Sequence, residues 1–220
     1  MVEIPSFFPL FAGLAAGATV LFLNGALLAA LDWAAPLDRS LSLYLYSWRS
    51  PGWDAVMGAI TWLGSAQILL PAALAAAVVF YLRKQPQQLS LLFAALLTWG
   101  LLNHPVKSFF ERARPDVAAA LVYEPTASFP SGHTLGAALI LPALFMALTG
   151  RSRPPAVTLL PILLVGISRI YLGAHWPSDV WASLLAALAF WLAALGVKRD
   201  TAPIDMAKDQ KSGGAHHETL

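Results

Sequence analysis

Long apolar stretches separated by short polar segments make up most of this chain. Six of them are candidate membrane-spanning helices, and they run roughly over Phe7–Leu31, Ala55–Leu82, Leu89–Asn103, Gly132–Leu148, Ala156–Tyr171 and Val180–Val197. A helix rises about 1.5 Å per residue, so about 20 apolar residues cross the roughly 30 Å hydrocarbon core of a bilayer. The third and fifth stretches are shorter and would extend into the segments that follow them. The pattern predicts an all-α protein, a six-helix transmembrane bundle.

The composition supports a membrane protein. Of the 220 residues, 58% are hydrophobic and 12% are charged, whereas soluble domains have about 25% charged residues. The mean hydropathy is +0.64. The net charge of +2 is small, and we expect no nucleic-acid partner. The chain has no cysteine, so disulfides and cysteine-based metal sites are excluded.

The apolar pattern indicates one membrane domain over residues 1–197. The polar stretch 198–220, which ends "KDQKSGGAHHETL", is expected to be a disordered cytoplasmic tail. Pro71, Pro142 and Pro161 lie inside predicted spans and are expected to kink them locally.

Six spans place alternate loops on the same side of a membrane. The loops Asp32–Asp54, Pro105–Ser131 and Leu172–Asp179 then share one side, and both termini lie on the other. These three loops also contain most of the unusual polar residues of the chain. We therefore expect the active site at one membrane face.

Three polar motifs fall in or beside these loops. The motifs are "KSFFERARP" with Lys107 and Arg114, "SFPSGHT" with Ser131, Gly132 and His133, and "SRIYLGAHWPSD" with Arg169, His175 and Asp179.

The basic residues of the motifs predict an anion site. Burying even one unpartnered charge at a membrane is costly, so Lys107, Arg114 and Arg169 together indicate a polyvalent anion, for which phosphate is the natural candidate. Ser131 offers a hydroxyl where the fourth span begins, and Gly132 would let the backbone approach the ligand. The N-terminus of a helix also favours an anion.

The two histidines predict phosphoryl chemistry. Asp179 follows His175 by four residues, so its carboxylate could hold one ring nitrogen as N–H and leave the other as a free lone pair. His175 is therefore the candidate nucleophile, and His133 the candidate general acid. A zinc site is the alternative for the His175–Asp179 pair. The nearby cations would repel a metal ion, so we expect neither metal nor cofactor.

Taken together, the motifs K-x6-RP, PSGH and SR-x5-H-x3-D resemble those of the phosphatidic acid phosphatase type 2 superfamily of membrane lipid phosphatases. The resemblance covers about Leu89 to Val197. It implies metal-independent removal of phosphate from lipid phosphates or diphosphates, with a phosphohistidine at His175 that water then hydrolyses. Phosphatidic acid, phosphatidylglycerol phosphate and polyprenyl diphosphate all stay open as substrates.

Two alternatives also stay open. In a lipid phosphotransferase, a second lipid would replace water at the phosphohistidine. A transporter or other anion-binding membrane protein would use the cations alone and would have no need of the His175–Asp179 pair.

Residues Asp38–Arg49 are expected to form either a short helix on the membrane surface or an ordinary interfacial loop. As a helix, the segment would have Asp38 as its N-cap and one apolar face, formed by Leu37, Leu41, Tyr44, Leu45 and Trp48. Arg112 is expected to contact lipid headgroups, and Trp176 and Trp181 to lie at the membrane interface.

The distribution of basic residues gives an orientation. The terminal side carries Arg83, Lys84, Arg151, Arg153, Lys198 and Arg199, and the motif side carries Arg39, Arg49, Lys107, Arg112, Arg114 and Arg169. Three of the motif-side residues are assigned to the anion. The remaining excess puts the termini in the cytoplasm and the active site in the periplasm of a bacterial cell.

This orientation is testable because the chain has no cysteine of its own. A cysteine introduced at Ser47 should react with a membrane-impermeant thiol reagent in intact cells, whereas one at Ser212 should react only after the membrane is permeabilised. The reverse labelling pattern would place the site on the cytoplasmic side.

Overall fold

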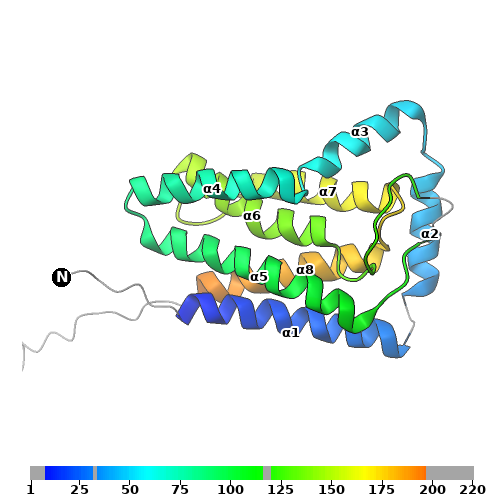
Figure 1. Ribbon diagram of the computed structural model, residues 1–220, viewed down its shortest axis with the longest axis horizontal. Helices are drawn as coiled ribbons and strands as arrows, with labels where there is room; N and C mark the ends of the chain where they lie inside the picture. Colours follow the sequence, from blue (N-terminus) through cyan, green and yellow to red (C-terminus); the bar gives the residue numbers. More distant parts are fainter. Residues whose placement is uncertain (1–7, 32–33, 116–119, 197–220) are drawn as a thin grey trace, which may run out of the picture.

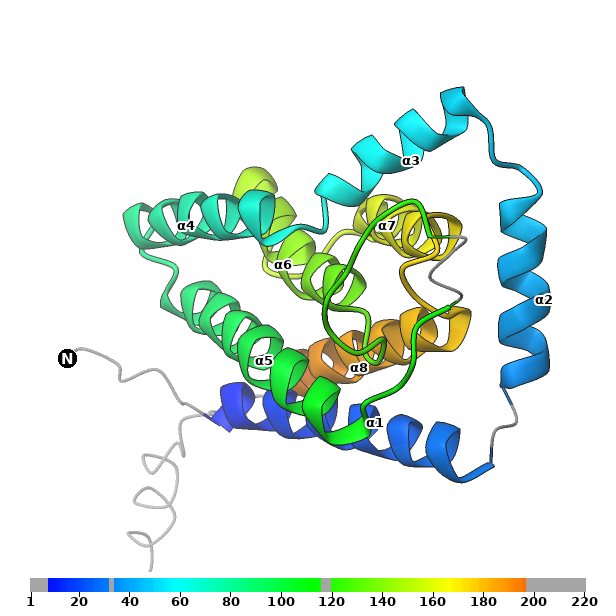
Figure 2. The same cartoon turned by 45° about the vertical axis from the view of Figure 1, so that its right-hand side comes forward.

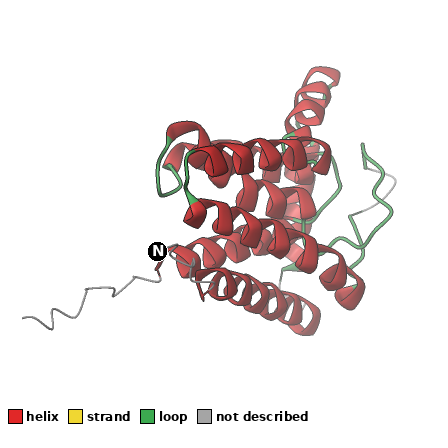
Figure 3. Ribbon diagram, turned by 60° about the vertical axis from the view of Figure 1, so that its left-hand side comes forward, coloured by secondary structure: helices red, strands yellow, loops and turns green. Residues whose placement is uncertain are grey.

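The computed structural model describes residues 8–31, 34–115 and 120–196, and this part of the chain is helical, with no strands (Figure 3). The helices are α1 (Phe8–Leu31), α2 (Ala35–Tyr46), α3 (Pro51–Trp62), α4 (Ala66–Leu82), α5 (Pro86–Phe110), α6 (Gly132–Thr149), the 3-10 helix η2 (Ala156–Thr158), α7 (Leu159–Tyr171) and α8 (Pro177–Gly196). The all-α prediction is confirmed. The predicted tail, 198–220, lies outside the described residues.

The long helices form one bundle around α6 (Figure 1). Helix α6 packs against α4, α5, α7 and α8, while α1 lies along α8 and α5. Within the described residues, five helical segments are long and apolar enough to cross a membrane, and the segment Ala156–Tyr171 is a shorter apolar helix. Its helical rise is about 24 Å, less than the roughly 30 Å core of a bilayer. The count of six spans therefore stays a prediction.

The second predicted span is broken into two helices. Helix α3 ends at Trp62 and α4 begins at Ala66, and α3 tilts away from the bundle axis (Figure 1). Gly64 lies at the break, where an added Cβ would be 2.9 Å from the carbonyl oxygen of His133 and 2.7 Å from Val165. The glycine therefore allows the chain to bend against the start of α6. The expected positions of bending, Pro71 and Pro142, lie inside continuous helices.

The helix observed at the third predicted span, α5, is much longer than the apolar stretch Leu89–Asn103 from which the span was predicted. Helix α5 continues through His104 and Pro105 to Phe110, and it ends at Glu111, whose φ of 44° is left-handed. The additional turns place Lys107 in the last turn of the helix. A membrane helix thus delivers the first motif directly to the end of the bundle.

Helix α2 lies across that same end, between α1 and α3 (Figure 2). Four of the expected apolar residues are exposed, namely Leu37, Leu41, Tyr44 and Trp48. Of the two alternatives for Asp38–Arg49, the helix is confirmed, with the bounds Ala35–Tyr46, but the prediction of its N-cap is wrong. Ala34 is the N-cap, and Asp38 is buried in the first turn.

Candidate active site

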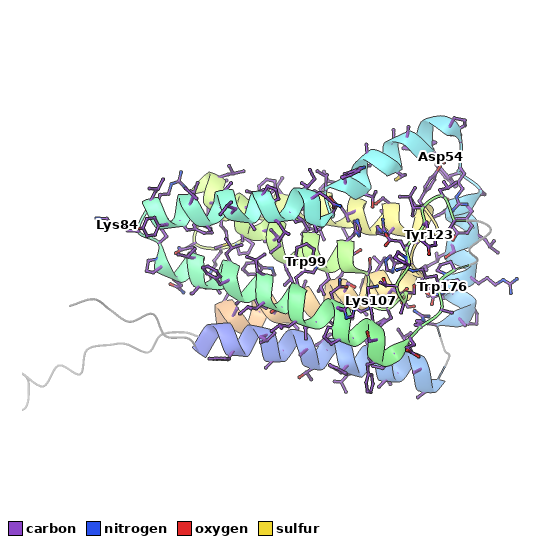
Figure 4. All side chains as sticks on the ribbon, in the orientation of Figure 1. Asp54, Lys84, Trp99, Lys107, Tyr123 and Trp176 are labelled. Atoms are coloured by element: carbon purple, nitrogen blue, oxygen red, sulfur yellow. The ribbon has the colours of Figure 1, made fainter. Side chains whose placement is uncertain are left out.

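The three motifs meet at the end of the bundle covered by α2 (Figures 1 and 2). Lys107, Tyr123 and Trp176 lie at this end, while Lys84 lies at the opposite end (Figure 4). The motifs come from the end of α5 with the segment after it, from the start of α6, and from the end of α7 with the turn into α8. Gly173 makes this last turn with a φ of +77°, a conformation that favours glycine.

Lys107 and Arg114 converge on one stretch of backbone. The Lys107 Nζ donates to the carbonyl oxygen of Ala127 at 2.6 Å, and Arg114 Nη2 donates to the same oxygen at 3.1 Å. Arg114 Nε also donates to the carbonyl of Thr126 at 2.7 Å. Burial lowers the pKa of Arg114 from its ordinary value, which is so high that the guanidinium keeps its charge at neutral pH.

Arg169, the third cation, is only 2% exposed. Its Nη1 donates to the Thr61 hydroxyl at 2.9 Å, and its Nη2 forms an ion pair with Glu124. Burial would raise the pKa of Glu124, but the charge of Arg169, its hydrogen bond and the charges of His133 and Arg114 together outweigh burial, so the pKa lies below its usual value. The Glu124 carboxylate is therefore ionised and paired with the Arg169 guanidinium.

The second motif forms the start of α6. Ser131 is the N-cap residue, as expected for a hydroxyl at the beginning of this helix, and its buried Oγ lies 2.9 Å from Thr134 Oγ1. A Cβ on Gly132 would lie 2.8 Å from Oδ1 of Asn103, so a larger residue here would require the Asn103 side chain of α5 to move. His133 is half-buried and lies within electrostatic range of Arg169 and Glu124.

His175 lies between a carboxylate and a cation. Its Nδ1 is 3.7 Å from Asp179 Oδ2, and its Nε2 is 3.5 Å from Arg114 Nη1. The side chain is 2% exposed. Burial, more than the nearby cations, lowers the pKa of His175 to about 3, so the ring is neutral at physiological pH. One ring nitrogen thus faces the aspartate and the other faces the basic residues.

Asp179 is fully buried, and its carboxylate accepts hydrogen bonds from several donors. Its Oδ2 accepts from Ser128 Oγ at 2.5 Å and from the backbone N–H of Trp176 at 2.9 Å. Its Oδ1 accepts from Arg112 Nη1 at 2.5 Å. The structure therefore brings Asp179 to His175, and two of the groups that hold it there, Arg112 and Ser128, lie outside the third motif.

The expectation that Arg112 contacts lipid headgroups is wrong, because its guanidinium joins Asp179 to Asp38. Burial would lower the pKa of Arg112, but the charges of these carboxylates and their hydrogen bonds raise it above the ordinary value. Asp38, Ser128 and Glu124 are site neighbours that the sequence does not assign. Ser128 lies in the second motif and Asp38 is a charged residue within an amphipathic helix, so each carries some signal, whereas Glu124 carries none.

A cavity of about 360 Å³ opens beside these residues. Arg114 and Glu124 line it, together with Tyr123 and Gly173. Of the three basic residues predicted to bind phosphate, Arg114 lies in the lining of this cavity.

A bundle of apolar helices with basic residues and two histidines gathered at one end defines an integral membrane protein built to bind and process an anion. The sequence profile of the PAP2 superfamily matches residues 87–201. The chain belongs to the PAP2 (phosphatidic acid phosphatase type 2) superfamily. The expected class, a membrane lipid phosphatase, is confirmed.

Comparison with known proteins supports this assignment over most of the chain. Phosphatidylglycerophosphatase B of Bacillus subtilis is 36% identical over 165 residues, which cover 70% of this chain and 80% of the relative. The undecaprenyl-diphosphatase BcrC of the same organism is 36% identical over 93 residues, 40% of this chain and 46% of the relative. The crystal structure of a transmembrane PAP2-type phosphatidylglycerolphosphate phosphatase from Bacillus subtilis aligns with a TM-score of 0.68 at 28% identity and covers 89% of this chain and 100% of that one.

Arg169→Lys tests whether the guanidinium of this residue matters beyond its charge. Lysine keeps the charge but loses the planar fork that reaches Thr61 and Glu124 at once. We expect phosphate release to fall by about 10²-fold, the effect of a small misplacement at a reacting centre.

Arg39→Lys is the matched control. Arg39 lies on α2 at the same end of the bundle, is exposed, and belongs to none of the three motifs. Its substitution should leave activity within about twofold of wild type, since most surface changes have small effects. Wild-type activity in Arg169→Lys would show that Arg169 contributes only its charge.

Proposed function

We propose that this membrane lipid phosphatase transfers the phosphoryl group of a lipid phosphate to His175 and then to water. The observation that carries the proposal is the placement of His175, with Nδ1 toward Asp179 and Nε2 toward Arg114. An imidazole oriented in this way offers its free lone pair on the side where the cations would hold a phosphate. Lys107, Arg114 and Arg169 are the proposed phosphate ligands, with Ser131 and Gly132 at the start of α6.

In the first step, Nε2 of His175 forms a bond to phosphorus and the bond from phosphorus to the lipid oxygen breaks. His133 donates a proton to that departing oxygen, so the lipid leaves as an alcohol, or as a lipid monophosphate if the substrate is a diphosphate. In the second step, water attacks the phosphohistidine and gives a proton to His133. The bond from phosphorus to Nε2 breaks, and inorganic phosphate and the free enzyme are restored.

The cations serve both steps by stabilising negative charge on the phosphoryl oxygens. In the described structure Arg169 is paired with Glu124. A substrate phosphate that binds Arg169 would have to displace or share this carboxylate. The negative charge of Glu124 therefore also neutralises Arg169 before substrate arrives.

The position of the site at the end of an apolar bundle supports a lipid substrate over a soluble phosphate ester. A lipid anchored in the bilayer would present its phosphate at the height of α2 and of the cavity beside Arg114 and Glu124. We propose that this face is extracytoplasmic, because the distribution of basic residues in the loops favours cytoplasmic termini. The relatives' names make phosphatidylglycerol phosphate the first substrate to test.

The function itself is tested by phosphate release from a panel of purified lipid phosphates and diphosphates in detergent. We expect release without added metal and in the presence of EDTA, because cations of the protein stabilise the charge. Orthovanadate should inhibit as a phosphate mimic. Loss of activity on chelation, restored by a divalent ion, would contradict the mechanism, and transfer to a second lipid without phosphate release would identify a phosphotransferase.

The two histidines are separated by their dependence on the leaving group. His175→Ala should abolish phosphorylation with every substrate, because no nucleophile remains. His133→Ala should lose about 10²- to 10⁴-fold on phosphatidic acid, whose alkoxide needs a proton. It should lose much less on p-nitrophenyl phosphate, whose phenolate leaves without one.

This comparison is measured as the initial burst of product, because His133 also serves the attack of water in the second step. Rescue of His175→Ala by the nitrophenyl substrate, or equal losses in both variants on both substrates, would contradict the assigned roles. Far-UV circular dichroism and thermal unfolding of each variant show whether the helical bundle is retained.

A further inference from the structure

Arg112 joins two acidic residues that lie far apart in the sequence. Its Nη2 is 2.8 Å from Asp38 Oδ2, and its Nη1 is 2.5 Å from Asp179 Oδ1. Nη1 also donates to Ser178 Oγ at 2.7 Å. We call this group of four residues, Asp38, Arg112, Ser178 and Asp179, the Arg112 bridge.

The two carboxylates of the bridge depend on Arg112 because both are buried. Asp38 is 2% exposed and Asp179 is 0% exposed. A buried carboxylate is strongly disfavoured unless it is paired with a positive charge and hydrogen-bonded. Among the described lysines and arginines, Arg112 is the one that forms an ion pair with either.

Asp38 also fixes the start of α8, the helix that carries Asp179. Its Oδ1 accepts from the backbone N–H of Ser178 at 2.8 Å, and its Oδ2 accepts from the Ser178 hydroxyl at 2.6 Å. A carboxylate in this position satisfies a free N–H of the first helical turn and suits the positive end of the helix. Helix α2 thus caps α8 from outside, one residue before Asp179.

These contacts restrain the orientation of the Asp179 carboxylate. Oδ2 faces His175, at 3.7 Å from Nδ1, while Oδ1 is held by Arg112 on the other side. Nδ1 of His175 has no hydrogen-bond partner among the described residues. The position of Asp179 Oδ2 therefore determines which group Nδ1 of His175 faces. The Arg112 bridge holds Oδ1, the other oxygen of the same carboxylate.

We infer that Arg112 and Asp38 are positioning residues for phosphoryl transfer, which act through Asp179 on the orientation of His175. The inference rests on the proposed roles of His175 and Asp179. Because Asp38 belongs to α2, the orientation of the His175 nucleophile also depends on α2 being packed in the position that the structure shows. The apolar residues on the outer side of α2, among them Leu41 and Tyr44, are exposed and available to the bilayer.

The experiment compares Arg112→Lys and Asp38→Asn with wild type. Lysine keeps one positive charge but cannot reach both carboxylates through a planar fork, and asparagine keeps the shape of Asp38 without its charge. We expect kcat to fall by about 10²-fold for Arg112→Lys and by a smaller factor for Asp38→Asn. KM and the inhibition constant of orthovanadate should stay within about twofold, because Lys107, Arg114 and Arg169 are unchanged.

Asp54→Asn is the matched control, since Asp54 lies at the same end of the bundle (Figure 4) and accepts a hydrogen bond from Tyr171 at 2.6 Å outside the bridge. It should keep wild-type kinetics.

A purely structural role of Arg112 would lower the fraction of enzyme that forms phosphoenzyme in a single turnover. Positioning predicts the same final fraction, formed more slowly, and a lower fraction at a normal rate would overturn the inference.

A double-mutant cycle tests the route through Asp179. In an Asp179→Asn background, Arg112→Lys should have little further effect on the residual rate, because the partner through which it acts is gone. Independent, multiplicative losses would overturn the inference. If His175→Ala keeps activity, the proposed function fails; if His175→Ala is inactive while Arg112→Lys and Asp38→Asn behave as wild type, only the role of the bridge fails.

Discussion

The pairing of buried charges is the constraint on which this site depends. Arg169 and Asp179 lie almost or fully out of contact with solvent at the end of an apolar bundle, where an unpaired charge is costly. Each therefore has an opposite charge, Glu124 for Arg169 and Arg112 for Asp179. The paired charges define two sides of the site. On one side, in the proposed mechanism, a phosphate would compete with Glu124 for Arg169, and on the other side Asp179 is enclosed and paired with Arg112.

Much of the architecture follows from the sequence. Apolar length predicts the helices, and the alternation of their direction brings the three motifs together, as the structure also has them at one end of the bundle. Residue chemistry was enough to nominate Lys107, Arg114 and Arg169 as phosphate ligands and His175 with Asp179 as the reacting pair. Their catalytic roles stay predictions.

The details that the sequence did not reveal depend on contacts between distant segments. The break near Gly64 is explained by the backbone of His133, which lies 69 positions later in the chain but packs against it. Arg112 looked like a surface charge because its partners, Asp38 and Asp179, belong to α2 and α8. Helix α5 continues beyond its apolar stretch because its last turns lie at the site, where a polar residue such as Lys107 has a hydrogen-bond partner, the carbonyl of Ala127.

In the proposed mechanism, His175 carries the phosphoryl group between the two steps. The most direct measurement is a rapid acid-free quench of a reaction with ³²P-labelled lipid phosphate, followed by peptide mapping of the labelled residue. The account predicts a phosphoramidate, stable to base and labile to acid, on the peptide that contains His175, and its absence in His175→Ala. A label on His133 or Ser131, or full single-turnover hydrolysis by His175→Ala, would contradict it.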